Sequence, residues 1–185
     1  MDLLQNTKLL YTGLVGLVAL ERCFELIVSR RNVRQLKARG AIESGAGHYP
    51  VMVALHTAFL VACPVEVWLL DRPWIPALAA PMLVLLAATM ALRYWVIATL
   101  GGRWNTRVLC LEGAAPVRHG PYRWMRHPNY LAVVLELLAL PLIHTAWLTA
   151  ALFGLANAAL LRVRITVEDA ALERCAPAVG SEELR

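Results

Sequence analysis

Long apolar runs, broken by short charged stretches, constrain the fold of this chain more than any other feature of its sequence. They cover residues 9–28, 49–70, 75–100 and 130–159. A helix needs ~20 apolar residues to cross the hydrocarbon core of a bilayer. Hydrophobic residues make up 59% of the chain and charged residues only 17%, against roughly 45–50% and about 25% in soluble domains. The sequence therefore predicts an all-α integral membrane protein.

The last run is too long for one membrane span and too short for two separate ones, which need ~40 residues. Pro141 and His144 interrupt it. We therefore predict a tight helical hairpin that turns near residues 141–145, with a second arm that continues to about Ile165. Together with the three earlier runs, the hairpin gives five transmembrane helices and no Rossmann fold.

These helices are expected to form one structural unit with two parts. Residues 1–100 are a membrane domain of three helices, of which the first extends past Arg30. Residues 101–185 are a loop, the transmembrane hairpin and a C-terminal segment. No small-residue cleavage site follows the first run, so we expect a retained helix and not a removed signal peptide.

Basic residues lie mostly on one side of the predicted helices. Of 18 lysines and arginines, five lie within residues 30–39, five within 103–126 and four within 162–185, while only Lys8 and Arg72 lie on the opposite side. Positively charged loops tend to stay in the cytoplasm. The distribution predicts an outside N-terminus and a cytoplasmic C-terminus, as in a bacterial inner membrane. We therefore expect the net charge of +5 to set the membrane topology and to contact anionic lipid, and not to bind nucleic acid.

The cysteines and histidines predict neither a disulfide framework nor a metal site. No Cys-x-x-Cys pair occurs among the four cysteines, which are Cys23, Cys63, Cys110 and Cys175. A zinc site on His119 and His127 would lack a third ligand of suitable spacing, so no metal is expected. The remaining histidines are expected to be packing or interfacial residues: His48, His56 and His144.

Several ionisable residues lie in or beside the apolar runs, where such groups usually face protein or water. Glu21, Arg22 and Glu25 form either the interfacial end of the first helix or the polar wall of a cavity. Arg93 is expected to snorkel toward the interface. Glu136 is either paired with an arginine such as Arg93 or part of a binding pocket.

The residues best able to do chemistry are concentrated in residues 118–130, between two apolar runs. His127-Pro128 keeps His127 out of helical geometry and places Pro128 at a helix start. The amides of residues 129–131 are expected to be free there and to bind a carboxylate or another anion. Three side chains offer aromatic faces for a flat ring or a cation: Tyr122, Trp124 and Tyr130.

A second polar group lies after the hairpin, in residues 162–169. Arg164 and Glu168 are four residues apart and therefore share one face of a helix. Such a pair is usually a surface ion pair of little energetic value. The predicted hairpin, however, returns it to the side of the membrane that carries His127, so we expect the two groups to meet.

The order of these motifs resembles the isoprenylcysteine carboxyl methyltransferase family. The matching elements are Gly120-Pro121-Tyr122, Arg126-His127-Pro128-Asn129-Tyr130, the apolar hairpin, and Arg164 followed by Glu168-Asp169. The resemblance is specific over residues 117–172. Within the family the chain is most similar to a bacterial branch that O-methylates alkylpyrone or alkylresorcinol polyketide lipids.

The resemblance implies a membrane methyltransferase that uses S-adenosylmethionine and releases S-adenosylhomocysteine. Glu168 would hold the amino group of the cofactor, and Arg164 would face the acceptor. The other residues implied in cofactor binding are Val117, His119, Gly120, Tyr122, His127, Pro128, Asn129 and Tyr130.

A lipophilic acceptor is expected to enter sideways from the bilayer, with its polar head at Arg164. A carboxylate, as in isoprenylcysteine, or an acidic pyrone enol is already anionic near neutral pH, whereas a phenol with a pKa of about 10 needs a base. His127 or Glu136 could be that base, and Glu136 could also contact the acceptor. Two further interpretations remain: a phospholipid N-methyltransferase, and a non-catalytic protein that docks on anionic lipid.

Overall fold

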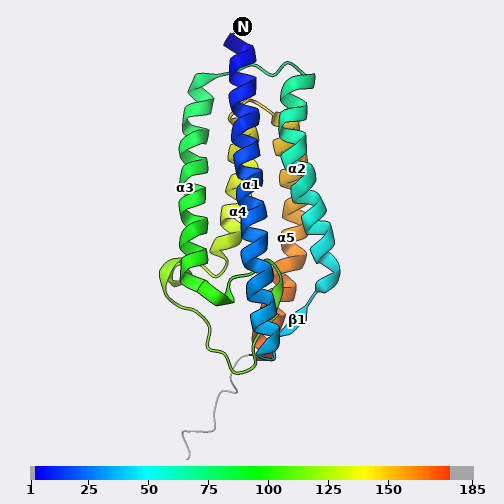
Figure 1. The fold of residues 1–185 in the computed structure, drawn as a ribbon, viewed down its shortest axis with the longest axis vertical. Helices are drawn as coiled ribbons and strands as arrows, with labels where there is room; N and C mark the ends of the chain where they lie inside the picture. The colour runs from blue at the N-terminus through cyan, green and yellow to red at the C-terminus, as the bar shows by residue number, and fades with distance from the viewer. Residues whose placement is uncertain (1–2, 176–185) are drawn as a thin grey trace, which may run out of the picture.

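Five helices in one bundle make up the structure, a computed structural model that describes residues 3–175 (Figure 1). The helices are α1 (Leu3–Ala38), α2 (Tyr49–Leu69), α3 (Pro76–Leu100), α4 (Pro128–Leu142) and α5 (Trp147–Cys175). Three stretches of the described chain are long and apolar enough to cross a membrane: Ala46–Leu69, Pro76–Arg103 and Trp147–Cys175. α4 is apolar but has only 15 residues. The predicted all-α membrane fold is confirmed, and three of its five predicted spans meet this criterion.

Proline and glycine set several helix boundaries. Pro76 and Pro128 begin α3 and α4, where a missing amide costs no helical hydrogen bond. Gly101 ends α3 with a φ of 51°, a conformation that strains any residue with a Cβ. The chain reverses between α4 and α5 at residues 143–146, so the predicted hairpin is confirmed.

Most of the basic residues gather at one end of the bundle, in the last turns of α1 and in the segment between α3 and α4 (Figure 1). We call it the basic end; it carries residues 30–39 and 103–126. The N-terminus, the link between α2 and α3 and the turn of the hairpin lie at the opposite end. The two charged segments predicted to meet, around His127 and around Glu168, both lie toward the basic end.

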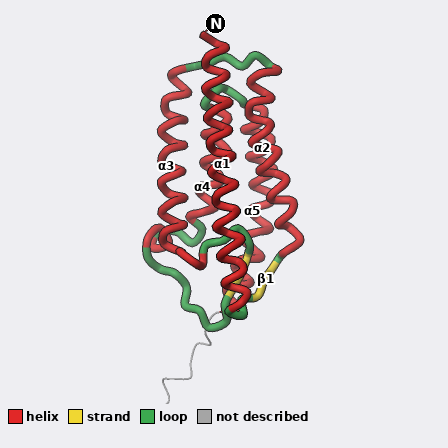
Figure 2. The backbone as a smooth tube through the Cα atoms, viewed as in Figure 1, coloured by secondary structure: helices red, strands yellow, loops and turns green. Residues whose placement is uncertain are grey.

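A short antiparallel ribbon, which the sequence did not predict, joins two loops at the basic end (yellow in Figure 2). β1 (Ile42–Ser44) follows α1, and β2 (Val108–Cys110) follows α3. Side chains of β2 pack against Val167 and Ala171 of α5. This packing covers the last turns of α5 with protein, which explains why the helix continues past its predicted end near Ile165.

Cys110 and Cys175 form a disulfide that ties β2 to the end of α5. The prediction that no cysteines pair is therefore wrong for these two. They lie 65 residues apart in the sequence, so no local spacing marks them as partners. The ribbon brings them together. Cys23 and Cys63 are free thiols.

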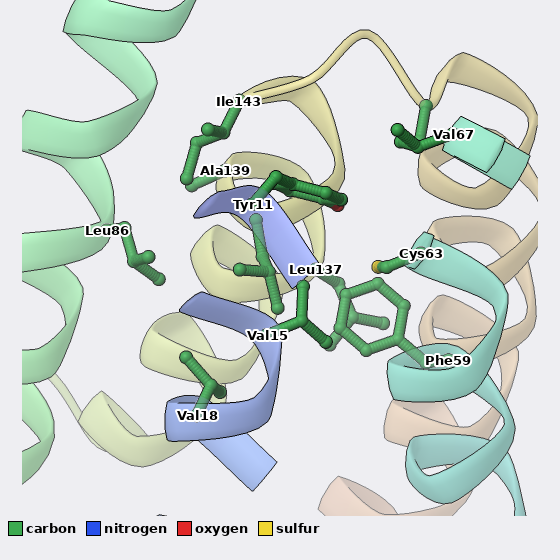
Figure 3. Packing of buried hydrophobic residues seen from close by; sticks show 12 residues of the cluster. Tyr11, Val15, Val18, Phe59, Cys63, Val67, Leu86, Leu137, Ala139 and Ile143 are labelled. Atoms are coloured by element: carbon green, nitrogen blue, oxygen red, sulfur yellow. The ribbon is translucent and has the colours of Figure 1, made fainter. Parts of the chain in front are cut away.

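An apolar core holds α1, α2, α3 and α4 together (Figure 3). Because lipid is as apolar as these side chains, the helices associate through close packing and not through the hydrophobic effect. The core includes Tyr11, Val15 and Val18 of α1, Phe59, Cys63 and Val67 of α2, Leu86 of α3, and Leu137 and Ala139 of α4. This packing forms the rigid frame on which the basic end is built.

Glu66 of α2 is buried at the end of the bundle opposite the basic end, where it caps the N-terminus of α5. Its carboxylate accepts hydrogen bonds from the amides of Leu148 and Thr149, at 3.1 and 2.6 Å. Amides in the first turn of a helix have no partner within the helix, and a negative charge there is stabilised by the helix dipole. Arg72 forms an ion pair with the same carboxylate at 2.6 Å. Glu66 therefore attaches the hairpin to the link between α2 and α3.

A buried ion cluster joins α1, α3 and α4 between the apolar core and the basic end. It consists of Glu21, Arg22, Glu25, Arg93 and Glu136. Arg93 donates to Glu136 and lies 3.7 Å from Glu25. The predicted snorkelling of Arg93 is wrong, because carboxylates on two neighbouring helices hold its side chain inside the bundle. Of the two alternatives for Glu136, the structure contains the pair with Arg93.

Arg93→Met is expected to destabilise the protein more than Glu136→Gln. The cluster holds three carboxylates and two guanidiniums, so losing Arg93 leaves two negative charges in excess, whereas losing Glu136 leaves none. Breaking a buried ion pair costs about 3–5 kcal/mol. Thermal unfolding in detergent micelles, followed by tryptophan fluorescence, measures the order of stability.

The double variant R93M/E136Q is the matched control. It restores the charge excess of the native cluster and should regain part of the stability that Arg93→Met loses. Equal unfolding temperatures for the two single variants would contradict this account of the cluster.

Candidate active site

Arg164 of α5 is deeply buried at the basic end, with 5% of its surface exposed. Its guanidinium donates to the backbone carbonyl of Thr106 at 3.0 Å and contacts the sulfur of Met52 on α2. These contacts hold α5 against α2 and the loop after α3. Within residues 3–175 its Nε has no hydrogen-bond partner, so the guanidinium retains a donor for an anion.

Tyr130, in the first turn of α4, joins the two arms of the hairpin. Its hydroxyl donates to the carboxylate of Glu168. The guanidinium of Arg164 lies 5.7 Å from its ring centroid. His127 stacks on the same ring, with centroids 5.2 Å apart and an interplanar angle of 19°. The structure thus brings together four of the predicted site residues, and the ring of Tyr130 is their common contact.

Three buried polar atoms, on His127, its neighbour Asn129 and Asp169, lack a hydrogen bond in the described chain: His127 Nε2, Asn129 Oδ1 and Asp169 Oδ1. The Nε2 of His127 and the Oδ1 of Asp169 are 3.2 Å apart, but not in hydrogen-bond geometry. Buried polar groups ordinarily have partners. These atoms therefore indicate a place where a polar ligand can bind.

The start of α4 differs from its predicted form. The amides of Tyr130 and Leu131 both donate to the carbonyl of His127, at 3.1 and 3.3 Å. Of the three amides predicted to be free for an anion, at residues 129–131, the prediction is therefore wrong for Tyr130 and Leu131. Because Pro128 begins the helix, His127 becomes the residue whose carbonyl accepts the first helical bonds.

Gly120 begins the short 3-10 turn η3 (Gly120–Arg123) at a φ of 58°. A Cβ at this position would lie 2.4 Å from Oγ1 of Thr99 on α3, so only glycine allows the turn to approach α3 so closely. The turn carries Tyr122 close to Glu168. Burial and the negative charge of Glu168 raise the pKa of Tyr122 to about 12, which keeps its phenol protonated at physiological pH.

Other predicted residues lie apart from this group. Val117 and His119 are in the loop before η3, and the side chain of His119 is exposed. Trp124 is exposed and packs edge-on against Trp95 of α3, with centroids 5.5 Å apart. Glu136 belongs to the ion cluster and lies six positions after Tyr130 along α4, at a rise of roughly 9 Å.

Thr106 is the residue of this site that the sequence did not predict. Its carbonyl holds Arg164, and its amide and hydroxyl contact Oγ of Ser29 on α1 at 3.0 and 2.9 Å. Its hydroxyl also lies 3.4 Å from the hydroxyl of Tyr49. These partners come from three different helices, so no local pattern could have marked Thr106.

Comparison with known proteins identifies one family. The isoprenylcysteine carboxyl methyltransferase (ICMT) family matches residues 81–174, which include all the residues around Tyr130. Among solved structures, the eukaryotic intramembrane Ras methyltransferase ICMT resembles this chain with a TM-score of 0.52 and 25% identity. The match covers 69% of this chain and 47% of the eukaryotic one, so this chain spans about half the length of that enzyme.

Two bacterial proteins are similar over most of their length. An uncharacterized protein of Bacillus subtilis (strain 168), YpbQ, is 40% identical over 163 residues, which are 86% of this chain and 95% of YpbQ. An uncharacterized protein of Haemophilus influenzae is 30% identical over 158 residues, which are 84% of this chain and 91% of its own.

Gly120→Ala is expected to lower the unfolding temperature by more than about 5 °C, because backbone strain of about 1 kcal/mol adds to the clash with Thr99. Gly113→Ala is the matched control: its φ is +72°, but no atom lies within 4 Å of the added Cβ. It should cost only the strain, about 2–4 °C. The double variant T99A/G120A should recover the part of the unfolding temperature that the clash with Thr99 removes. Equal decreases in unfolding temperature for Gly120→Ala and Gly113→Ala would refute the packing argument.

Proposed function

The chain belongs to the isoprenylcysteine carboxyl methyltransferase family of membrane methyltransferases, and we propose that it methylates an acidic oxygen of a lipophilic acceptor. The observation that carries the proposal is the convergence of His127, Arg164 and Glu168 on the ring of Tyr130. The preferred acceptor is a lipid of the alkylpyrone or alkylresorcinol type, and an isoprenylcysteine-type carboxylate is the second candidate.

The residues present fit S-adenosylmethionine, which carries an ammonium, a carboxylate and a sulfonium. Glu168 and Asp169 supply negative charge for the ammonium, and Asn129 and His127 have buried polar atoms without partners in the described chain. The rings of Tyr122 and Tyr130 offer faces to a cation. When bound, the cofactor supplies an electrophilic methyl group, whose bond to sulfur breaks as its bond to the acceptor oxygen forms, leaving S-adenosylhomocysteine.

The remaining cofactor contacts are assigned by the family motif. Glu168 holds the amino group, and Val117 with its neighbours covers the adenine through backbone contacts. Pro128, Gly120 and His119 are assigned to the same cofactor site by the motif alone. Arg164 is assigned to the acceptor, since its Nε has no partner in the part of the chain that the structure describes and a guanidinium can bind an anion through two parallel hydrogen bonds.

The chemistry of Arg164 favours an acceptor that is already an anion. A carboxylate or an acidic enol needs orientation more than it needs a base, and a guanidinium orients it well. For a phenol acceptor we propose His127 as the base, because Asp169 lies 3.2 Å from its Nε2 and can stabilise its protonated form. Glu136 is the weaker candidate, since Arg93 already neutralises its carboxylate.

The acceptor is identified by incubating purified protein in detergent with radiolabelled S-adenosylmethionine and one lipid at a time. Suitable lipids are an alkylpyrone, an alkylresorcinol, a prenylcysteine analogue and phosphatidylethanolamine. Transfer to the pyrone or resorcinol supports the proposal. Transfer to phosphatidylethanolamine alone would replace it by phospholipid N-methylation.

Glu168→Ala is expected to weaken cofactor binding by about 10- to 100-fold, the value of a hydrogen bond to a charged group. Arg164→Ala should leave cofactor binding nearly unchanged and lower kcat by about 100-fold or more. Equilibrium dialysis with labelled cofactor and initial-rate assays separate the two effects. Glu173→Ala, an exposed carboxylate on the same helix, is the control. Normal binding and turnover in both site variants would refute the assignment.

We also propose that the basic end faces the cytoplasm of a bacterial cell, from the positive-inside rule. Thiols there are kept reduced, so Cys110 and Cys175 are expected to be free in growing cells and bridged after oxidation. Acid trapping followed by labelling with maleimide-polyethylene glycol counts the thiols, with Cys110→Ser and Cys175→Ser as references. A bridge in freshly quenched cells would place this end in an oxidising compartment.

A further inference from the structure

A long apolar groove runs along α2 beside α5, with a volume of about 1080 Å³. Small side chains line its α2 wall, including Val53, Ala54, Thr57, Ala58, Val61 and Ala62. The wall extends from Tyr49 to Val65, a length of roughly 24 Å along the helix. This length is most of the ~30 Å thickness of the hydrocarbon core. The groove can therefore hold a long alkyl chain that lies parallel to the helices.

Arg107 lies at the end of this groove that meets the basic end. It is the one charged residue among the described residues that line the groove. Its guanidinium lies 4.0 Å from the ring centroid of Tyr49, and a third of its side chain is exposed. The groove thus combines an apolar body with a single cationic end, the pattern expected of a site for a lipid with an anionic head.

Glu43, the counter-ion of Arg107, also forms an ion pair with a second cation, Lys37. The carboxylate of Glu43 accepts from Arg107 and from Lys37, each at 2.5 Å. When an incoming anion binds Arg107, Glu43 still has Lys37 as partner. An anionic head group can therefore replace Glu43 at Arg107 without leaving a carboxylate unpaired.

The cationic end of the groove adjoins the proposed active site. Arg107 follows Thr106, whose carbonyl holds Arg164. Met52, which contacts Arg164, precedes Val53 in the groove wall. A lipid in the groove would therefore have its head at Arg107, next in the chain to the residue whose carbonyl holds Arg164.

We propose that Arg107 is the residue that determines acceptor specificity: it selects lipids whose anionic head is attached to a long alkyl tail lying in the groove between α2 and α5. The inference rests on the proposed methyl transfer for the identity of the lipid, and on the groove and its charges for the site.

Arg107→Gln is expected to raise KM for a long-chain anionic acceptor by about tenfold, with little change in kcat or in cofactor binding. Arg34→Gln, which removes an exposed charge from α1 at the same end, should leave KM unchanged. A neutral long-chain acceptor should have the same KM with the wild type and with R107Q. An unchanged KM in R107Q for the long-chain anion would overturn the role of Arg107.

Ala58→Phe fills the groove near its middle and should lower activity on long-chain acceptors while sparing short-chain ones. Ala87→Phe makes the same change on an exposed position of α3 and serves as the control. Equal effects of these two variants on long-chain substrates would overturn the position of the tail.

A binding experiment tests the site independently of catalysis. A long-chain carboxylic acid with a diazirine on its tail is photolysed with the protein in detergent, and crosslinked peptides are mapped by mass spectrometry. Crosslinks are expected within residues 49–65, to be reduced in R107Q and lost in Ala58→Phe, and to be competed by the free acid but not by phosphatidylcholine. Competition by phosphatidylcholine, or labelling spread equally over α3, would mean that the groove holds only bulk lipid. Specific crosslinking without methyl transfer to any lipid would refute the proposed function and leave the groove assignment intact.

Discussion

A charge buried among membrane helices is tolerated only beside a partner, and the bundle depends on this constraint. At one end Glu66 closes the start of α5 and pairs with Arg72. Further along, Arg93 joins α3 to Glu136 of α4. Apolar helices gain no hydrophobic energy from one another in lipid. Packing alone would therefore only weakly specify how far each helix is shifted along its axis relative to its neighbours. These polar contacts fix the axial positions of the helices, and therefore also the position of the basic end.

At the basic end the same constraint is met in a different way. Arg164 is held by a neutral carbonyl and a sulfur, and Glu168 by the hydroxyl of Tyr130. Neither charge is cancelled by an opposite charge in these contacts. The site therefore keeps a cationic donor near the ring of Tyr130 and an anionic acceptor at its hydroxyl. That arrangement suits a cofactor with charges of both signs and an anionic lipid head, which the ion cluster around Glu136 does not.

Local sequence signals predicted the parts of this protein that depend on a few neighbouring residues. The apolar runs predicted the helices, and Pro141 together with the length of the last run predicted the hairpin. The proximity of His127 to Glu168 followed from the hairpin and the distribution of basic residues. The prediction for Arg93 failed because a distant partner, Glu136, draws its side chain inward. The prediction for the amides of Tyr130 and Leu131 failed for a local reason, because the carbonyl of His127 accepts hydrogen bonds from both.

The membrane environment, the helical fold and the motif residues of the family can be read from the amino-acid sequence, because hydrophobicity, proline and glycine act locally. Which polar atoms meet depends on how the helices and loops pack. The β1–β2 ribbon, the Cys110–Cys175 bridge and the contacts of Thr106 all join segments far apart in the chain. The position of Arg107 at the end of the groove has the same origin, since the ribbon and α2 place it there. Such contacts have no sequence period, because they are set by how the helices pack.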